Sequence, residues 1–270
     1  MIEAKHPGAN PPRFGHNRLS DKSKEDVAES GLVEDIILPE DLEEEVENSK
    51  LDDGDRRRLQ AEDLEPTLDL RPLLGGVRDQ GYCGSCWAFA ANVAFEGAIK
   101  VAHGEDVQIS DQHLVSCDPY NGGCYGGWMA NAWYYQYFNG AVKASDYPYL
   151  SGADYDSRAC DIPANAEYVD YRPLWSYIYY QPAEDIKRAL KKGPVTTALN
   201  AYSPGFMSYR SGVLTNVDTT TINHAMVIVG YTEDAWILQN SWGTWWGDQG
   251  YIKIDINTDL WINIAVEPIV

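Results

Sequence analysis

The chain has 270 residues and a mass of 30.2 kDa, enough for one large domain or two modest ones. Hydrophobic residues make up 44% and charged residues 23%, as is typical of soluble globular proteins. The formal charge of −20 argues against nucleic acid and anionic membranes as partners, since both are negatively charged. No apolar stretch approaches the roughly 18 residues that span a bilayer, and residues 1–12 show no signal-peptide pattern.

Residues 1–65 differ from the rest of the chain in composition. They hold 19 Asp and Glu against 9 Lys and Arg, and Phe14 is their only aromatic residue. This composition predicts an acidic tail or appendage and no independent domain. Residues 36–39 form a short apolar segment within this acidic region, and we expect this segment to lie in a groove of the protein. The Arg cluster at residues 56–58 fits a proteolytic processing site and a solvated linker equally well.

From residue 68 onward the chain carries nearly all of its Trp and Tyr. Apolar periodicity and capping residues predict helices over residues 86–101, 110–116, 128–138 and 182–192. Strand patterns follow over residues 195–199, 225–231, 236–240 and 251–256. Helices followed by strands predict an α+β chain in two lobes. The 18 Tyr and 9 Trp fit either an aromatic or carbohydrate-binding surface or a core, and we expect a core.

The cysteines leave two interpretations open from their spacing alone. There are five of them: Cys83, Cys86, Cys117, Cys124 and Cys160. An odd number leaves at least one thiol free if the others pair within the chain, and four paired cysteines allow three connectivities. Alternatively, Cys83, Cys86, Cys117 and Cys124 offer four sulfurs to zinc, although the second spacing is wider than in a usual zinc knuckle.

The surroundings of Cys86 indicate a catalytic thiol. Residues 83–87 read CGSCW, a nucleophile pattern that is completed by a His and an Asn far downstream. His224 lies 138 residues after Cys86 and Asn240 lies 154 residues after it. A thiolate at the start of the predicted helix is favoured by the helix N-terminus, and an imidazolium at His224 would stabilise it further. We therefore expect the pKa of Cys86 to be lowered, with Asn240 orienting the imidazole.

From about residue 68 to the end, the chain resembles the papain-like cysteine proteases. Further matching segments are Gln80-Gly81, the cysteine block at 116–127, residues 147–149 with Cys160, residues 223–225 and the Asn block at 240–247. The resemblance implies a papain-like two-lobe α+β fold, with a helical left lobe, a β-barrel-like right lobe and a cleft between them. The protease domain is then residues 66–270, with lobes over about 66–178 and 179–270.

The resemblance also implies roles for individual residues. Cys86, His224 and Asn240 are the expected catalytic residues, and Gln80 with the backbone N–H of Cys86 would bind the oxyanion. One such donor is typically worth about 2.7–4 kcal/mol. Trp242 would shield the hydrogen bond between His224 and Asn240. The implied disulfides are Cys83–Cys124 and Cys117–Cys160, which leave Cys86 free.

Substrate contacts follow from the same resemblance. The substrate backbone would pair with Gly126 and Gly127, whose missing Cβ atoms permit close approach. The residues that match the wall of the S2 pocket are all apolar, and they are Met129, Ala198, Ile222 and Ile264. They predict a hydrophobic residue two positions before the scissile bond. Asn223 and Trp242 complete the predicted substrate-binding set.

These residues predict a secreted, disulfide-bonded cysteine endopeptidase, synthesised as a zymogen, that acts on peptides or proteins without a metal or cofactor. Residues 1–65 lack a long helical propeptide pattern, yet they are the expected occluding segment of the cleft. Bridged cysteines imply an oxidising compartment (secreted, periplasmic or lysosome-like), the alternative being a reduced cytosolic enzyme. The rival functions are a catalytically silent binding relative, another thiol enzyme such as a transglutaminase or amide transferase, and a metal-bound structural module.

Overall fold

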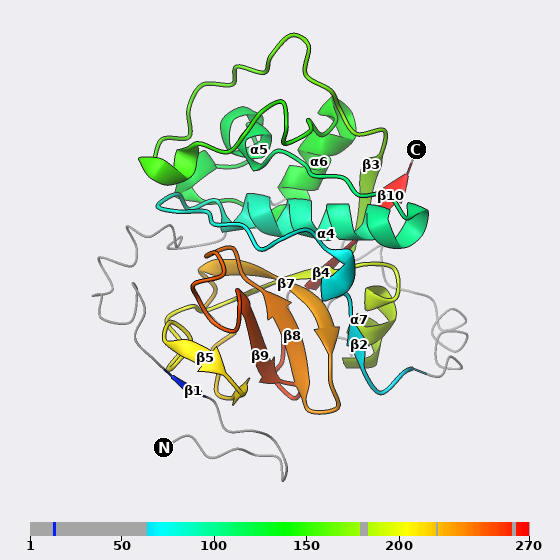
Figure 1. Ribbon diagram of the computed structural model, residues 1–270, viewed down its shortest axis with the longest axis vertical. Helices are drawn as coiled ribbons and strands as arrows, with labels where there is room; N and C mark the ends of the chain where they lie inside the picture. Colours follow the sequence, from blue (N-terminus) through cyan, green and yellow to red (C-terminus); the bar gives the residue numbers. More distant parts are fainter. Residues whose placement is uncertain (1–12, 15–63, 179–182, 220, 261–262, 270) are drawn as a thin grey trace.

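The computed structural model describes residues 13–14, 64–178, 183–219, 221–260 and 263–269. The apolar segment at residues 36–39 and the Arg cluster at 56–58 lie outside the described residues. A helical lobe that contains α4 (Cys86–His103), α5 (Asp111–Cys117) and α6 (Met129–Asn139) packs against a lobe built on a twisted sheet (Figure 1). The α+β class predicted from the order of the elements is confirmed.

The three helices of the helical lobe match the predicted ranges to within two residues at each end. Ser110 caps α5 as predicted, because its Oγ accepts a hydrogen bond from the backbone N–H of His113 at 3.0 Å. Helix α4 ends at Gly104, whose φ of 75° lies in the left-handed region. Most of α4 is buried, since its many alanines allow the helix to pack closely on the sheet.

The main sheet has the strand order β3-β10-β4-β7-β8-β9-β6. Its strands are β3 (Arg172–Tyr177), β4 (Val195–Leu199), β6 (Val213–Leu214), β7 (His224–Tyr231), β8 (Ala235–Gln239), β9 (Tyr251–Asp255) and β10 (Asn263–Ile269). Only the β6–β9 pair is parallel among the described pairs. Shorter elements are β1 (Arg13–Phe14), β2 (Leu68–Asp69), β5 (Tyr209–Ser211), α7 (Ala183–Leu190), η1 (Arg71–Leu73), η2 (Gly123–Tyr125) and η3 (Ser151–Ala153).

The four predicted strands β4, β7, β8 and β9 are confirmed. The sequence patterns missed the short strands β2, β5 and β6 and the longer strands β3 and β10. The strands β3 and β10 each contain a proline, and Pro173 and Pro268 lie opposite each other in the antiparallel pair. Proline is unfavourable in a central strand because it donates no ladder hydrogen bond. It is tolerated here because β3 is an edge strand and β10 pairs with β4 only over residues 263–265.

The two lobes are tied together by strands from distant parts of the chain. β2 pairs with β7, and β10 pairs with both β3 and β4. One apolar cluster accordingly contains residues of α4 and α6 together with Ala225 of β7 and Ile264 of β10. The prediction that the large aromatics form a core holds for the fully buried Trp87, Trp128, Trp133, Trp236 and Trp246.

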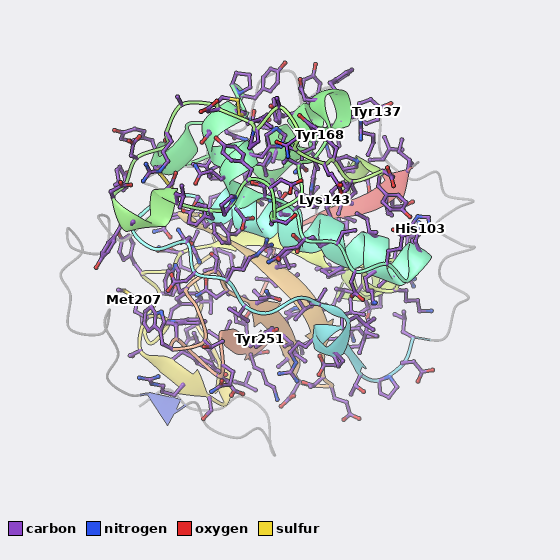
Figure 2. The ribbon with its side chains drawn as sticks, turned by 45° about the horizontal axis from the view of Figure 1, so that its top comes forward. His103, Tyr137, Lys143, Tyr168, Met207 and Tyr251 are labelled. Atoms are coloured by element: carbon purple, nitrogen blue, oxygen red, sulfur yellow. A yellow bond between two sulfur atoms is a disulfide. The ribbon has the colours of Figure 1, made fainter. Side chains whose placement is uncertain are left out.

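The side chains of both lobes are shown in Figure 2, where Tyr137 and Tyr168 lie on the helical lobe and Met207 and Tyr251 lie on the sheet lobe. Within the described ranges, no helix has the length and apolarity that crossing a membrane requires.

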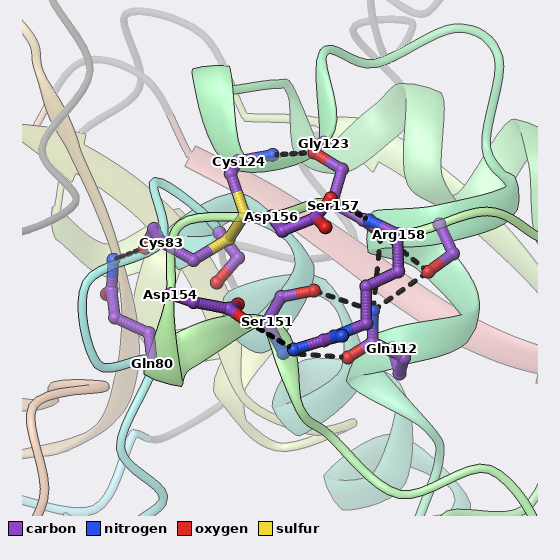
Figure 3. Close-up of a disulfide and its surroundings, with 12 residues drawn as sticks. Gln80, Cys83, Gln112, Gly123, Cys124, Ser151, Asp154, Asp156, Ser157 and Arg158 are labelled. Carbon is purple, nitrogen blue, oxygen red and sulfur yellow. Dashed lines mark hydrogen bonds and ion pairs between the residues drawn. A yellow bond between two sulfur atoms is a disulfide. The ribbon is translucent and has the colours of Figure 1, made fainter.

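Two disulfides join loops of the helical lobe. Cys83 bonds to Cys124, 41 residues away, and Cys117 bonds to Cys160, 43 residues away (Figure 3 shows the first pair). This is the pairing that the family resemblance implies, and Cys86 is the free cysteine. Three of the four proposed zinc ligands are thus bonded to sulfur, and the described residues contain no cluster of three or more metal-ligand side chains. The zinc alternative is therefore wrong for this structure.

Candidate active site

Cys86 is the first residue of α4 and is 1% exposed. The turn before it is fixed by Tyr149, whose hydroxyl donates to the carbonyl of Gln80 at 2.8 Å and also bonds to Ser85 Oγ at 2.8 Å. The helix N-terminus presents unpaired backbone N–H groups and a partial positive charge to the thiol. The start of α4 therefore contributes one effect that favours a negative charge on the sulfur, and burial opposes it.

His224 enters the same place from the other lobe, as the first residue of β7. The backbone N–H of the next residue, Ala225, donates to Cys86 Sγ at 3.5 Å, which brings the start of β7 against the thiol. His224 Nε2 bonds to Asn240 Oδ1 at 2.7 Å, and because this oxygen can only accept, Nε2 carries the hydrogen. The other ring nitrogen, Nδ1, is buried and has no hydrogen-bond partner among the described residues. In the neutral ring it is the atom able to take a proton.

Aromatic rings cover the bond between His224 and Asn240. The ring of Trp242 lies 4.7 Å from the imidazole between centroids, tilted by 34°. Phe206 meets Trp242 edge-on at 5.7 Å, and both of these rings are buried. A hydrogen bond kept from water is stronger than an exposed one, so this cover holds the imidazole in a fixed tilt and tautomer.

Gln80 is fully buried, and its side-chain amide is held from two sides. Its Nε2 donates to the carbonyl of Cys83 at 2.8 Å (Figure 3), and its Oε1 accepts from Ser241 Oγ at 2.6 Å. The backbone N–H of Gln80 also donates to the carbonyl of Ser241 at 2.8 Å. The loop that carries Gln80 is therefore attached to the loop that carries Asn240.

Gly81 follows Gln80 in this turn, and a side chain would not fit at its position. Its φ is +64°, and a Cβ would lie 2.2 Å from the carbonyl oxygen of Gly152. The sequence patterns selected Gln80 but missed Ser241 and Tyr149, the two side chains that hold it. Both lie in segments that already match the family, yet their hydrogen bonds connect residues 69 and 161 positions apart, which no local pattern reports.

The predicted substrate-binding residues fall into two groups. Met129, Ala198 and Ile264 belong to one buried apolar cluster, against which Ile222 packs. Gly126 and Gly127 follow the turn η2, and a Cβ on Gly127 would lie 2.5 Å from Asn121 Oδ1. The side chain of Asn223 is engaged elsewhere, because it accepts from Ala201 N–H and donates to Asn200 Oδ1 in the turn after β4.

Burial dominates the electrostatics of the site. It raises the pKa of the Cys86 thiol to about 11, although the backbone N–H groups of Ala225, Trp87 and Cys86 act in the opposite direction. Burial also lowers the pKa of His224 to about 4, opposed only by the bond to Asn240. The lowered thiol pKa expected from the sequence is therefore not found in this buried site, where burial favours a neutral thiol beside a neutral imidazole.

A cavity of about 250 Å³ lies elsewhere, between the segment at residues 73–78, α4 and residues 105–108. None of the predicted site residues lines it. Its walls carry both signs of charge, from Arg78 and Lys100 and from Glu96, Glu105 and Asp106. The candidate active site is thus defined by the convergence of side chains between the lobes and not by the size of a cavity.

Comparison with known proteins agrees with this geometry. The model of the papain family cysteine proteases matches residues 65–270. A probable cysteine protease RDL2 of Arabidopsis thaliana is 40% identical over 194 residues, which are 68% of this chain and 52% of that protein. Zingipain-2 of Zingiber officinale is 35% identical over 73% of this chain and 90% of that protein. The chain belongs to the papain family of cysteine proteases.

Solved structures show the same fold. The digestive procathepsin L2 proteinase of Tenebrio molitor larval midgut matches with a TM-score of 0.79 and 30% identity, over 95% of this chain and 84% of that one. The ragweed pollen allergen Amb a 11, a cysteine protease solved in its proform, matches with a TM-score of 0.70 and 32% identity, over 78% of this chain and 66% of that one. The chain spans 52% to 62% of the length of the first curated relatives that it matches.

Because His224 is buried in its neutral form, we expect the free energy of unfolding to depend on pH. Between pH 4 and 6.5 the unfolded chain binds a proton at this residue and the native chain does not. Stability therefore rises with pH over this window and is lost as the pH falls toward 4. In a Cys86→Ala background, which prevents self-cleavage, His224→Asn should flatten the dependence of the unfolding free energy on pH, measured by urea denaturation. His103→Asn, at an exposed histidine, is the matched control. Equal slopes in all three chains would contradict a neutral buried imidazole.

Proposed function

We propose that this chain is a cysteine endopeptidase in which Cys86 attacks the carbonyl carbon of a peptide bond. The observation that carries this function is the hydrogen bond from Ala225 N–H to Cys86 Sγ at 3.5 Å, which brings the nucleophile to the strand that begins with its base. Nδ1 of His224, left without a partner among the described residues, is the acceptor of the thiol proton. Because Asn240 Oδ1 bonds to Nε2, Nδ1 is the ring nitrogen that is available for the thiol proton.

The reaction then proceeds in two halves. The proton of Cys86 moves to His224 Nδ1, the thiolate attacks, and the carbonyl oxygen becomes an oxyanion bound by Gln80 Nε2 and the backbone N–H of Cys86. The tetrahedral intermediate collapses as Nδ1 gives its proton to the leaving amine, which leaves an acyl-enzyme. Water enters, gives a proton to Nδ1 and attacks the thioester. The second collapse releases the acid and returns the proton to the sulfur.

Formation of the thiolate–imidazolium pair depends on charging both groups together. Burial disfavours either charge alone, as the pKa values of Cys86 and His224 show. Two opposite unit charges about 4 Å apart attract each other by about 4 kcal/mol at the effective dielectric of a protein site. The thiolate and the imidazolium therefore stabilise each other. Opening the site to water further reduces the desolvation free energy that opposes both charges. A neutral orienter such as Asn240 suits this pair because it adds no third charge.

The substrate chain would lie along Gly126 and Gly127, with an apolar side chain in the pocket formed by Met129, Ala198, Ile222 and Ile264. Burial of these four residues in or against one apolar cluster supports that specificity. Asn223 would contribute through its backbone, since its side chain is bonded to the turn at Asn200. The two disulfides support an oxidising compartment.

The N-terminal segment would keep the enzyme inactive until it is removed. Three observations support this role: the near-complete burial of Cys86 and His224, the pairing of Arg13–Phe14 with Tyr209–Ser211, and the likeness to a procathepsin and to a protease in its proform. The acidic segment then acts as a cover, and a neutral thiol under that cover is protected from reaction. We place the protease domain at residues 66–270, with its helical and β-rich lobes meeting near residue 178.

The first prediction from this function concerns the nucleophile and the oxyanion donor. Cys86→Ala should reduce hydrolysis of a fluorogenic peptide, assayed with a thiol reductant, by at least roughly 10⁴-fold. Gln80→Ala should lower kcat by about 10²- to 10³-fold, because it removes one oxyanion donor.

The matched control is Gln108→Ala, which changes an exposed glutamine at the separate cavity and should retain wild-type kcat. Retained turnover in Cys86→Ala would exclude the mechanism, and an inactive wild-type chain would indicate a silent relative.

The second prediction concerns the cover. Deletion of residues 1–58 should raise the rate of peptide hydrolysis at least tenfold over that of the full chain. The rate of the full chain is measured at the earliest times, before self-cleavage removes the segment. The residues 1–58 supplied as a separate peptide should inhibit the shortened enzyme. Equal activity of the two chains from the first time point would show that the segment is a linker and not an inhibitor.

A further inference from the structure

A chain of hydrogen bonds supports the loop that carries Gly126 and Gly127. Asn121 Oδ1 accepts from the backbone N–H of Trp128 at 2.7 Å, and Asn121 Nδ2 donates to the carbonyl of the same residue at 3.3 Å. Nδ2 also donates to Asp118 Oδ2 at 2.6 Å. A single side chain thus holds both backbone groups of the residue that follows Gly127.

Asp118 is the anchor of this arrangement. It lies directly after α5 and next to Cys117, which the disulfide to Cys160 fixes in place. Its Oδ1 accepts from the backbone N–H of Tyr120 at 2.9 Å, so both carboxylate oxygens serve as acceptors. The residue is only 5% exposed, and no cation forms an ion pair with it among the described residues. A buried carboxylate without a counter-ion is costly, and here the hydrogen bonds from Tyr120 and Asn121 offset that cost.

The contact with Gly127 shows what the arrangement positions. A Cβ on Gly127 would meet Asn121 Oδ1 at 2.5 Å and the ring of Trp87 at 2.7 Å. Gly127 is therefore pressed between Asn121 and the residue after the nucleophile. A change in the position of Asn121 would shift the backbone that faces the substrate, while Cys86 is held independently by α4 and by the Tyr149 bonds.

We propose that Asn121, held by the carboxylate of Asp118, is a positioning residue that fixes the backbone of Gly126 and Gly127 for pairing with the substrate main chain. This role rests on the proposed peptidase function and adds two residues to it. Its contribution is to substrate binding and not to the reactivity of the thiol. Loss of either side chain should therefore raise KM and leave kcat nearly unchanged.

The charge of Asp118 gives this role a pH dependence. Burial raises the pKa of Asp118 to about 6, against the bonds from Tyr120 and Asn121. Tyr135 on α6 is the ionisable group that faces it, with a pKa raised to about 12, and His113 of α5 bonds to Tyr135 with a pKa lowered to about 4. Both neighbours are neutral between pH 5 and 8. Protonation of Asp118 below pH 6 removes one acceptor and loosens Asn121.

The test uses the protein expressed as the full chain and assayed after processing, with a peptide long enough to lie along Gly126 and Gly127. Asp118→Asn cannot offer two acceptors, so at pH 7.5 its KM should be roughly tenfold above that of the wild type, with kcat within about twofold. Below pH 5 the two proteins should have the same KM, since the wild-type carboxyl is then protonated as well. The double variant Asp118→Asn/Asn121→Ala should be no worse than Asn121→Ala alone, because the two residues act in series.

Alkylation of Cys86 by iodoacetamide separates this role from the function on which it rests. This small reagent does not need the glycine backbone, so its rate at pH 7.5 should be the same in wild type and in Asp118→Asn. A ratio of KM values that stays constant from pH 5 to pH 7.5, or a pure loss of kcat, would overturn the positioning role. An equal loss of alkylation would show general misfolding and would overturn it too. A wild-type chain that alkylates but hydrolyses no peptide would instead overturn the peptidase function.

Discussion

The contact between the first residue of α4 and the first residues of β7 is the constraint on which the rest of the structure depends. It brings a thiol from one lobe to the backbone N–H of Ala225, the residue after His224 in the other lobe, and this N–H donates to Cys86 Sγ at 3.5 Å. The tight packing of alanine-rich α4 on the sheet and the crossing strands β2 and β10 hold the lobes at this distance. Because both elements begin at the site, small shifts of either lobe change the geometry of the reacting atoms directly.

The sequence predicted the parts of the molecule that local patterns encode. The CGSCW segment selects Cys86, and the spacing to His224 and Asn240 follows the papain family, to which the chain belongs. Periodicity located α4, α5 and α6 and the four strands β4, β7, β8 and β9 of the sheet interior. β3 and β10 were missed because each carries a proline. Only the tertiary pairing shows that Pro173 lies in an edge strand and that Pro268 lies beyond the residues of β10 that pair with β4.

Two features of the site depend on contacts that the sequence does not contain. Ser241 and Tyr149 orient the Gln80 loop across long separations. The pKa of Cys86 was expected to be lowered, because a helix N-terminus and a nearby imidazole both favour a thiolate. Burial outweighs them in the structure and raises the pKa of Cys86, which favours a neutral thiol. Exposure of a site is a property of the whole fold, and a residue pattern gives no measure of it.

Protection and activation then follow from the same pair of groups. In the buried site neither Cys86 nor His224 is favoured to ionise alone. In the proposed mechanism, water and substrate enter and the two groups ionise together by transfer of one proton. The most direct test is the pH profile of the Cys86 alkylation rate, measured with iodoacetamide in the uncovered enzyme and in its His224→Gln variant. The account predicts a fast, nearly level rate from pH 6 to 8 that is lost in the variant, where reaction requires alkaline pH. The same alkaline titration in both proteins would contradict a proton shared between Cys86 and His224.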